Sequence, residues 1–221
     1  MHNAALLSHQ IATLRRAMSE PTPNPADLLM VRDLDGRTVR PLNPPPGVTP
    51  RESAVLLLLF PASGELWLPL TVRSSRLTTH RGEVSLPGGG ADPDDHDPAA
   101  TALREAEEEL GIDRSTVEVL GHMTSFYIPP SNNRLTPVVG LSSVTPHFKP
   151  DPHEVEAAFV VPLRQLFDPE TIREEIWERQ GLKMRVPFFW LEERKVWGAT
   201  ALLLSELVSR MRMFDPPAAA R

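Results

Sequence analysis

The stretch PGGGADPDDHDPAATALREAEEELGI, residues 87–112, joins a glycine-rich turn to an acidic segment with helical periodicity. We predict a helix over residues 99–110, because alanine and leucine recur there at the spacing of one buried helix face. Asp97 is the candidate N-cap, and Gly111 is expected to end the helix in a left-handed conformation. Residues 105–109 contain four glutamates, and the nearby cation is the arginine that precedes them.

Three of these glutamates are expected to lie together. Glu105, Glu108 and Glu109 fall on one arc of the helix, because residues three and four positions apart are neighbours on a helix surface. Glu107 points elsewhere and is expected to be solvated. Arg104 stands four residues before Glu108 and is expected to pair with it. Such a group of carboxylates is either a solvated helix face or the site of a divalent cation, which takes oxygen ligands.

The preceding turn, Pro87 to Gly90, favours the cation. Glycine lets the backbone bend and approach a ligand closely, and the carbonyls of the turn are further oxygen donors. The four aspartates of loop 91–98 are better explained as turn formers and helix caps. The residues therefore predict a site for a divalent metal between this turn and the helix.

The remainder of the chain predicts a layered α+β fold, an α/β/α sandwich with a mixed β-sheet between helices. A hairpin is expected over 174–191 with its turn near Gln180-Gly181, and a last helix over 199–213. The other expected strands are 53–60, 65–73, 82–90, 116–127, 134–145 and 154–163.

The chain divides into three regions by composition. Residues 1–50 are expected to hold an amphipathic helix, with apolar residues at helical spacing from Leu7 to Met18, and a proline-rich connector. Residues 51–215 form the compact domain, and residues 216–221 form a tail. The N-terminal helix either packs on the domain or mediates a homodimer.

Composition excludes several classes of protein. Apolar residues make up 41 % of the chain, which is enough for a buried core. The formal charge of −6 argues against a general nucleic-acid binder. The chain has no cysteine, no secretory signal pattern, and no apolar run longer than residues 54–60, so we expect neither a thiolate site nor a membrane partner. A cytoplasmic location is the resulting expectation.

The same stretch resembles the signature of the Nudix hydrolase family, G-x5-E-x7-R-E-U-x-E-E-x-G-U, where U is a bulky aliphatic residue. Gly90 stands at the first glycine, and residues 104–112 supply the second half in register. His96 stands where the family has its first glutamate, and Asp92 and Asp95 are candidates to substitute for it. The role of that first glutamate is therefore open in this chain.

The resemblance implies a Nudix fold and hydrolysis of a nucleoside diphosphate linked to another group, with Mg²⁺ or Mn²⁺ as cofactor. Glu105 and Glu109 would be the first-choice metal ligands. Glu108 would be a third ligand or the residue that polarises water, so that Glu105 and Glu108 are the candidate catalytic residues. The backbone of Gly89 and Gly90 would contact the metal or the substrate.

LTVRSSRLTTHRGEVSLPGG, residues 70–89, resembles the coenzyme A pyrophosphatase branch of that family, LLTxRSxxxRxxxGxVxFPGG. Arg73 matches and is the favoured substrate-binding cation, whereas Thr78 replaces the second arginine. Residues 197–201, WGATA, are similar to a segment near the C-terminus of the same branch. The resemblance spans roughly residues 52–205 and implies cleavage of coenzyme A or an acyl derivative to 3′,5′-ADP and 4′-phosphopantetheine.

Two alternatives stay open. One is a Nudix enzyme with another small nucleotide substrate, such as ADP-ribose, a dinucleotide or an oxidised nucleotide. The other is a catalytically impaired binding module, which His96 motivates. Further candidates are Arg76, His80 and Arg81 for phosphate contacts. Glu154 is a distal ligand, a base or a solvated residue. Tyr127 either lines the substrate pocket or belongs to a plain hairpin loop.

Overall fold

The computed structural model of the chain describes residues 2–19, 25–39, 41–75 and 82–215. Arg76, His80 and Arg81, which we expected near phosphate groups, therefore lie outside the described residues, as does the tail 216–221. Among the described residues, no helix combines the length and the apolar character that crossing a membrane requires.

The larger of two β-sheets has eight strands, in the order β4-β3-β2-β8-β6, with β9 beside β3, β5 beside β2 and β7 beside β8. β2 and β8 run parallel, whereas the other pairs are antiparallel, so the sheet is mixed as predicted. The strands are β2 (Arg51–Ala62), β3 (Glu65–Arg73), β4 (Val84–Ser85), β5 (Gly88–Gly90), β6 (Val117–His122), β7 (Phe126–Ile128), β8 (Asn133–Ser142) and β9 (Val155–Pro162).

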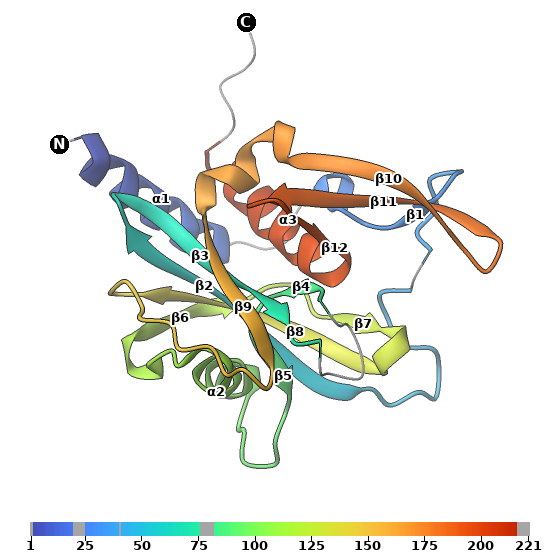
Figure 1. The fold of residues 1–221 in the computed structure, drawn as a ribbon, viewed down its shortest axis with the longest axis horizontal. Coiled ribbons are helices and arrows are strands. Elements are labelled where there is room, and N and C mark those ends of the chain that lie inside the picture. The colour runs from blue at the N-terminus through green and yellow to red at the C-terminus, as the bar shows by residue number, and fades with distance from the viewer. Residues whose placement is uncertain (1, 20–24, 40, 76–81, 216–221) are drawn as a thin grey trace, which may run out of the picture.

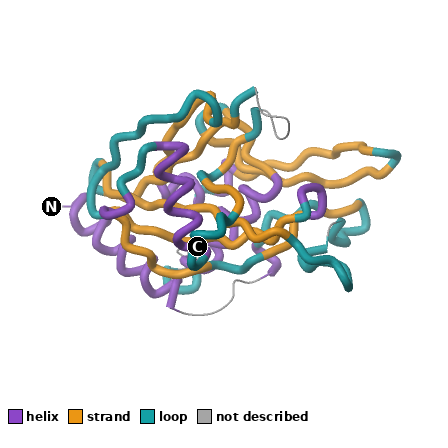
Figure 2. The backbone as a smooth tube through the Cα atoms, turned by 90° about the horizontal axis from the view of Figure 1, so that it is seen from below, coloured by secondary structure: helices purple, strands orange, loops and turns teal. Residues whose placement is uncertain are grey.

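The smaller sheet is antiparallel and contains the predicted hairpin. Its strands are β1 (Arg32–Asp33), β10 (Ile172–Arg179), β11 (Leu182–Leu191) and β12 (Arg194–Trp197). The hairpin turns at Gln180 and Gly181, both with positive φ, as two-residue hairpin turns require. It projects from the body of the molecule (Figure 2).

Three helices cover the two faces of the larger sheet (Figure 1). They are α1 (His2–Ser19), α2 (Pro98–Leu110) and α3 (Gly198–Arg212), and the short 3₁₀ helices are η1 (Pro25–Asp27), η2 (Arg114–Thr116), η3 (Pro129–Ser131), η4 (Leu163–Phe167) and η5 (Pro169–Thr171). Helix α2 lies on one face, and α1 and α3 lie on the other. The observed architecture is the predicted α/β/α sandwich.

The apolar run of β2 is buried on both of its faces, which explains its composition. Leu56 and Leu58 belong to the core against α2, whereas Leu57 and Leu59 belong to the core that also contains residues of α1 and α3. Successive side chains of a strand point to opposite faces, so an unbroken leucine run fits a strand between two helical layers.

Two expected strands are each divided in the structure. Residues 82–90 form β4, which pairs with β3, and β5, which pairs with β2. Pro87 lies between them and cannot donate to a ladder, although its carbonyl accepts from the Leu56 amide at 2.9 Å. Residues 116–127 form β6 and β7, because the Thr124 amide between them donates to the Glu206 carboxylate of α3.

Helix α1 packs against the domain. Leu14 and Ala17 are fully or almost fully buried in the core shared with α3, and Arg15 forms an ion pair with Glu118 of β6. Packing on the domain was one of the two expectations for this helix.

The connector after α1 also contacts the domain, through α3 and β11. The Ser209 hydroxyl of α3 donates to Asp27 at 2.9 Å, the Leu29 amide donates to Ser205 of α3 at 2.9 Å, and β1 pairs with β11. Residues before the expected boundary at 50 thus pack on the C-terminal part of the domain.

Replacement of Leu14 by alanine is expected to lower the free energy of unfolding of the whole domain by about 2–5 kcal/mol, because it leaves a cavity between α1 and the sheet. Urea denaturation followed by circular dichroism measures this. Leu6→Ala on the same helix is the control, since Leu6 is 43 % exposed, and it should change the free energy by less than about 0.5 kcal/mol. A separate early transition of the helix in Leu14→Ala would contradict the integrated packing.

Candidate metal-dependent active site

Helix α2 begins and ends as its sequence predicts. The Asp97 side chain accepts a hydrogen bond from the Ala100 amide at 2.8 Å, and Pro98 occupies the first turn. Gly111 has a φ of 65° and its amide donates to the Glu107 carbonyl at 2.8 Å. These caps fix the start and end of the helix and so determine where its glutamates point.

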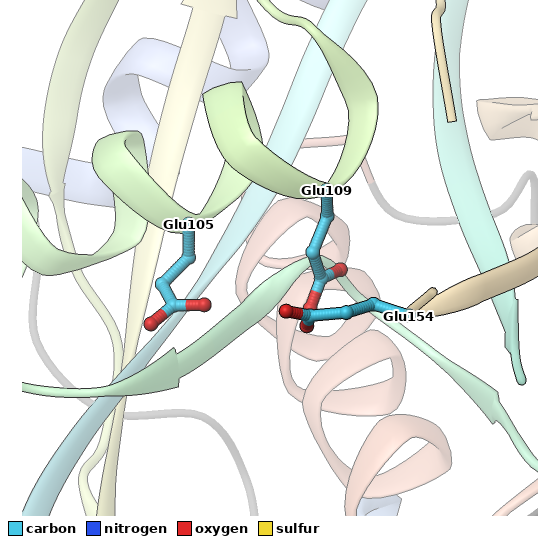
Figure 3. Close-up of side chains that lie close together, drawn as sticks. All are labelled: Glu105, Glu109 and Glu154. Atoms are coloured by element: carbon cyan, nitrogen blue, oxygen red, sulfur yellow. The ribbon is translucent and has the colours of Figure 1, made fainter. Parts of the chain in front are cut away.

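Three carboxylates meet beside α2. Glu105, Glu109 and Glu154 each contribute an oxygen, and these oxygens all lie within 4.8 Å of one another. Figure 3 shows the Glu105 and Glu109 side chains descending from the helix toward the Glu154 side chain. Glu154, for which ligation, base catalysis and solvation were all open, thus joins the two first-choice ligands. We call these three residues the carboxylate cluster.

The segment before β9 is tied to α2, and this places Glu154. The Lys149 amide donates to the Leu110 carbonyl at 2.7 Å, and the Asp151 amide donates to the Glu109 carbonyl at 2.9 Å. The carbonyl of Glu154 accepts from the Ser74 amide at 2.8 Å, just after β3. Glu154 is therefore held between the end of the acidic helix and the larger sheet.

Burial makes the carboxylate cluster a poor place for negative charge without a counter-ion. Glu109 is only 3 % exposed, and burial, with Glu154 and Glu105 adding to it, raises its pKa to about 8 against the opposing effect of Arg73. Burial also raises the pKa of Glu105, although the hydrogen bond from Arg104 opposes this. A bound cation would favour the ionised forms of both carboxylates and so oppose the effects of burial and of their mutual repulsion.

Glu108 and Glu107 lie outside the carboxylate cluster. Glu108 is on the other flank of Glu105 from Glu109, since each residue advances the helix by about 100°. Its side chain is 58 % exposed and accepts from Arg104 at 3.0 Å, which is the predicted pair. Glu107 pairs with Arg114. The structure thus brings two of the three predicted helix ligands together and leaves Glu108 near solvent.

The glycine turn lies directly against the carboxylates. A Cβ atom added to Gly89 would lie 2.5 Å from Glu105 Oε1, so a larger residue would displace that carboxylate. The Gly90 carbonyl accepts from the Arg104 guanidinium at 2.9 Å. The pairing of β5 with β2 holds both glycines in place. The two predicted glycines therefore border the site, Gly89 on the Glu105 carboxylate and Gly90 on Arg104.

Arg104 connects the acidic loop, the helix and the glycine turn. Besides Gly90 and Glu108, it donates to Asp95 and to Glu105, both at 3.0 Å. The hydrogen bond from Arg104 lowers the pKa of Asp95 to about 2. Asp95 was a candidate to substitute for the glutamate expected at position 96, and it contacts Arg104, the arginine that precedes the four glutamates.

His96 itself points away from these groups. Its side chain is 81 % exposed and lies 3.6 Å from the Asp97 carboxylate. His96 is therefore an exposed side chain of the loop and is not a member of the carboxylate cluster.

A cleft of about 590 Å³ adjoins the glycine turn. Arg73 lines it, and its Nε atom is buried without a hydrogen-bond partner among the described residues. Distant segments supply other residues of the cleft. Asn133 and Arg179 carry no signal in the sequence, whereas Trp197 and Thr200 belong to the WGATA segment noted above. Tyr127 lies in a neighbouring pocket, where its hydroxyl donates to Asn132 at 3.1 Å.

The residues present fit a hard divalent cation. The carboxylate cluster offers oxygen donors alone, which Mg²⁺ and Mn²⁺ prefer, and the close approach of Gly89 leaves backbone rather than side chain beside Glu105. Burial raises the pKa values of Glu105 and Glu109, so a cation bound between them would favour their ionised forms. Glu105, Glu109 and Glu154 are the residues that would hold the ion.

Comparison with known proteins agrees with this chemistry. The NUDIX domain family model matches residues 50–181. "Nudix hydrolase 15, mitochondrial" of Arabidopsis thaliana is 40 % identical over 180 residues, which cover 78 % of this chain and 63 % of that protein. "Nudix hydrolase 22, chloroplastic" of the same organism is 41 % identical over 162 residues, covering 70 % and 53 %.

A bacterial relative matches over its full length. "Uncharacterized Nudix hydrolase NudL" of Photorhabdus laumondii is 35 % identical over 193 residues, which cover 84 % of this chain and 100 % of that protein. The chain thus spans less than two thirds of the two plant relatives and all of this bacterial one.

Glu109→Gln is expected to remove a pH dependence of stability from the metal-free protein. The unfolded chain releases the Glu109 proton near pH 4.5, whereas the folded protein retains it to about pH 8. The free energy of unfolding therefore falls as the pH rises through this window, and glutamine abolishes that fall. Thermal unfolding in EDTA between pH 4 and 9 measures it. Equal slopes in the two proteins would contradict the raised pKa.

Asp95→Asn is expected to weaken Mn²⁺ binding by roughly 10–100-fold, because it loosens Arg104 and hence the position of Glu105. Isothermal titration with Mn²⁺ measures the dissociation constant. His96→Ala, at the adjacent and exposed position, is the matched control and should alter it less than about twofold. Equal losses in both variants would show that the loop as a whole, and not the Asp95–Arg104 pair, supports the site.

Proposed function

Because the chain belongs to the NUDIX domain family, we propose that it is a metal-dependent pyrophosphohydrolase that cleaves coenzyme A or an acyl-coenzyme A. The products would be 3′,5′-ADP and 4′-phosphopantetheine or its acyl form. The observation that carries the proposal is the convergence of Glu105, Glu109 and Glu154 beside Gly89, at the border of a cleft large enough for a nucleotide derivative.

The proposed role of the carboxylate cluster is to hold Mg²⁺ or Mn²⁺ against a diphosphate. Such an ion supplies charge neutralisation at phosphate oxygens and lowers the pKa of water. The chain orients the cluster through the Arg104 contacts and the hydrogen bonds of residues 149 and 151 to the end of α2. Ligands held in this way lose little freedom when the ion and substrate bind.

Arg73 is the proposed contact for the diphosphate. It lies on β3, lines the cleft, and opposes the raised pKa of Glu109 through its charge. Its buried Nε has no hydrogen-bond partner among the described residues, so a phosphate oxygen would provide one. We propose that the backbone of Gly89 and Gly90 forms the wall of the cleft opposite Arg73, where a side chain would obstruct the substrate.

Glu105 and Glu108 remain the proposed catalytic residues, although they lie in different surroundings. Glu105 belongs to the carboxylate cluster, whereas Glu108 is exposed and is held by Arg104. An exposed carboxylate can take a proton from water while the buried ones stay with the ion. Glu154 shares the cluster and is the alternative proton acceptor.

Support for coenzyme A among the possible substrates comes from the sequence of residues 70–89, with Arg73 as its cation. Other nucleoside diphosphate derivatives, such as ADP-ribose or a dinucleotide, satisfy the same cluster and form the first alternative. The impaired binding module has less support, since His96 is exposed and Asp95 contacts Arg104 instead. A cytoplasmic location and a homodimer stay predictions from the sequence.

The test is hydrolysis of a substrate panel with Mg²⁺ or Mn²⁺. We expect coenzyme A and acyl-coenzyme A to be cleaved with a kcat/KM at least tenfold above that for ADP-ribose or a diadenosine polyphosphate. Glu105→Gln, Glu109→Gln and Glu154→Gln should each lower it by at least about 100-fold, because a ligand contributes several kcal/mol of charge stabilisation. Products are identified by chromatography and mass spectrometry.

Two further variants make the test specific. Glu107→Gln is the matched control on the same helix, since Glu107 pairs with Arg114 away from the cluster, and it should change kcat/KM by less than twofold. Glu108→Gln should lower kcat by about 10²–10⁴-fold at unchanged Mn²⁺ affinity if Glu108 moves the proton. Rapid ADP-ribose cleavage without coenzyme A turnover would overturn the substrate, and full activity of all three cluster variants would overturn the active site.

A further inference from the structure

An apolar pocket of about 80 Å³ lies beside the cleft, and the connector that follows α1 supplies part of its wall. Leu29, Val31 and Leu42 of the connector face Ile128 at the end of β7 and Leu202 of α3 across it. The connector and α3 both lie outside residues 50–181, the part of the chain that the family model matches. The pocket is therefore formed jointly by residues 126–129 of the matched region and by segments outside it.

The pocket and the cleft adjoin each other. Ile128, Gly198 and Ala199 line both of them. The cleft is also lined by Arg73 and the glycines of β5, which border the carboxylate cluster. A substrate whose diphosphate lies at the cluster, and which extends along the cleft past Ile128 and Ala199, would bring its far end to the edge of the pocket.

The connector is fixed in the position that forms the pocket. The Leu29 amide donates to Ser205 of α3 at 2.9 Å, and the Leu42 carbonyl accepts from the Tyr127 amide at 2.8 Å. Between these points β1 pairs with β11. The pocket is therefore formed before any ligand arrives, which lowers the entropic cost of binding there.

The pocket offers apolar surface and few free hydrogen-bonding groups. Tyr127 is the polar side chain among its described lining residues, and its hydroxyl already donates to Asn132 at 3.1 Å. The Val31 carbonyl accepts from the Val39 amide at 3.2 Å, and the Met30 amide donates to Leu28 at 2.9 Å. The side chains of the pocket therefore offer no free partner to the polar edges of a nucleobase, whereas an aliphatic chain needs none.

We propose that this pocket binds the aliphatic end of the substrate's non-nucleotide half, so that the enzyme selects short-chain acyl derivatives over the free thiol. The identity of the nucleotide half rests on the proposed function. Leu202 and Leu42 are the specificity-determining residues, one on the helix wall and one on the connector wall of the pocket. The N-terminal connector thereby takes part in substrate selection.

Binding of coenzyme A, butanoyl-coenzyme A and hexanoyl-coenzyme A to the full chain tests the proposal. Isothermal titration in EDTA prevents turnover, and kcat/KM with Mg²⁺ gives the parallel kinetic ratio. The wild-type protein should bind hexanoyl-coenzyme A at least tenfold more tightly than coenzyme A, because one buried methylene contributes about fourfold. Equal affinities for the three ligands would overturn the proposal.

Two variants locate the effect. Leu202→Trp fills the pocket and should reduce the ratio of hexanoyl-coenzyme A to coenzyme A affinity to below about twofold. Leu42→Ala removes one apolar wall at a position that is 37 % exposed, so that folding is little affected, and should lower the ratio about threefold. Val144→Trp, at an exposed position away from the pocket, is the matched control and should leave the ratio unchanged. A wild-type ratio in both pocket variants would overturn the proposal.

The outcomes separate the proposal from the proposed function. If hexanoyl-coenzyme A binds more tightly through Leu202 but no coenzyme A derivative is cleaved, the pocket stands and the proposed reaction fails. If coenzyme A derivatives are cleaved at rates independent of chain length, the reaction stands and the pocket assignment fails.

Discussion

The guanidinium of Arg104 is the interaction on which the site depends. It contacts Asp95 of the acidic loop, Glu105 of the helix and the Gly90 carbonyl, so three consecutive segments share one cation. Without it, Asp95 and Glu105 would be two partly buried anions close together, and burial of unpaired charge is costly. Arg104 thereby allows the acidic loop and the acidic helix to pack together, and it leaves Glu109 and Glu154 as the charges that a metal would compensate.

The ends of α2 and its internal ion pair could be predicted from the sequence, because each depends on residues that are close together in the chain. The caps at Asp97 and Gly111 and the pair of Arg104 with Glu108 follow from residues within a turn of one another, and the structure confirms them. The leucine run of β2 likewise predicted a strand, and the structure adds that both of its faces are buried, because helices lie on both sides of the larger sheet. The layered α+β architecture followed from the same alternation of strand and helix patterns.

The rest could not be predicted because it depends on distant contacts. Glu154 joins the carboxylate cluster through hydrogen bonds from residues 149 and 151 to the end of α2, and nothing near residue 154 in the sequence distinguishes it from a solvated glutamate. Glu108 lies on the predicted arc of the helix, but on the side of Glu105 that faces away from Glu109. The division of the strand expected over residues 82–90 and the walls of the cleft likewise depend on which strands become neighbours.

The parallel pairing of β2 with β8 has a consequence for the order in which the molecule forms. It pairs Arg51 with Asn133, which is distant in the sequence. β9 comes later still in the chain and joins the sheet by pairing with β3. Contacts between such distant segments carry a large loop-closure entropy and form slowly. Two glutamates of the cluster belong to α2, but Glu154 reaches them only through the segment that leads into β9. The complete cluster therefore requires the assembled sheet, and we expect affinity for a divalent ion to report on that assembly.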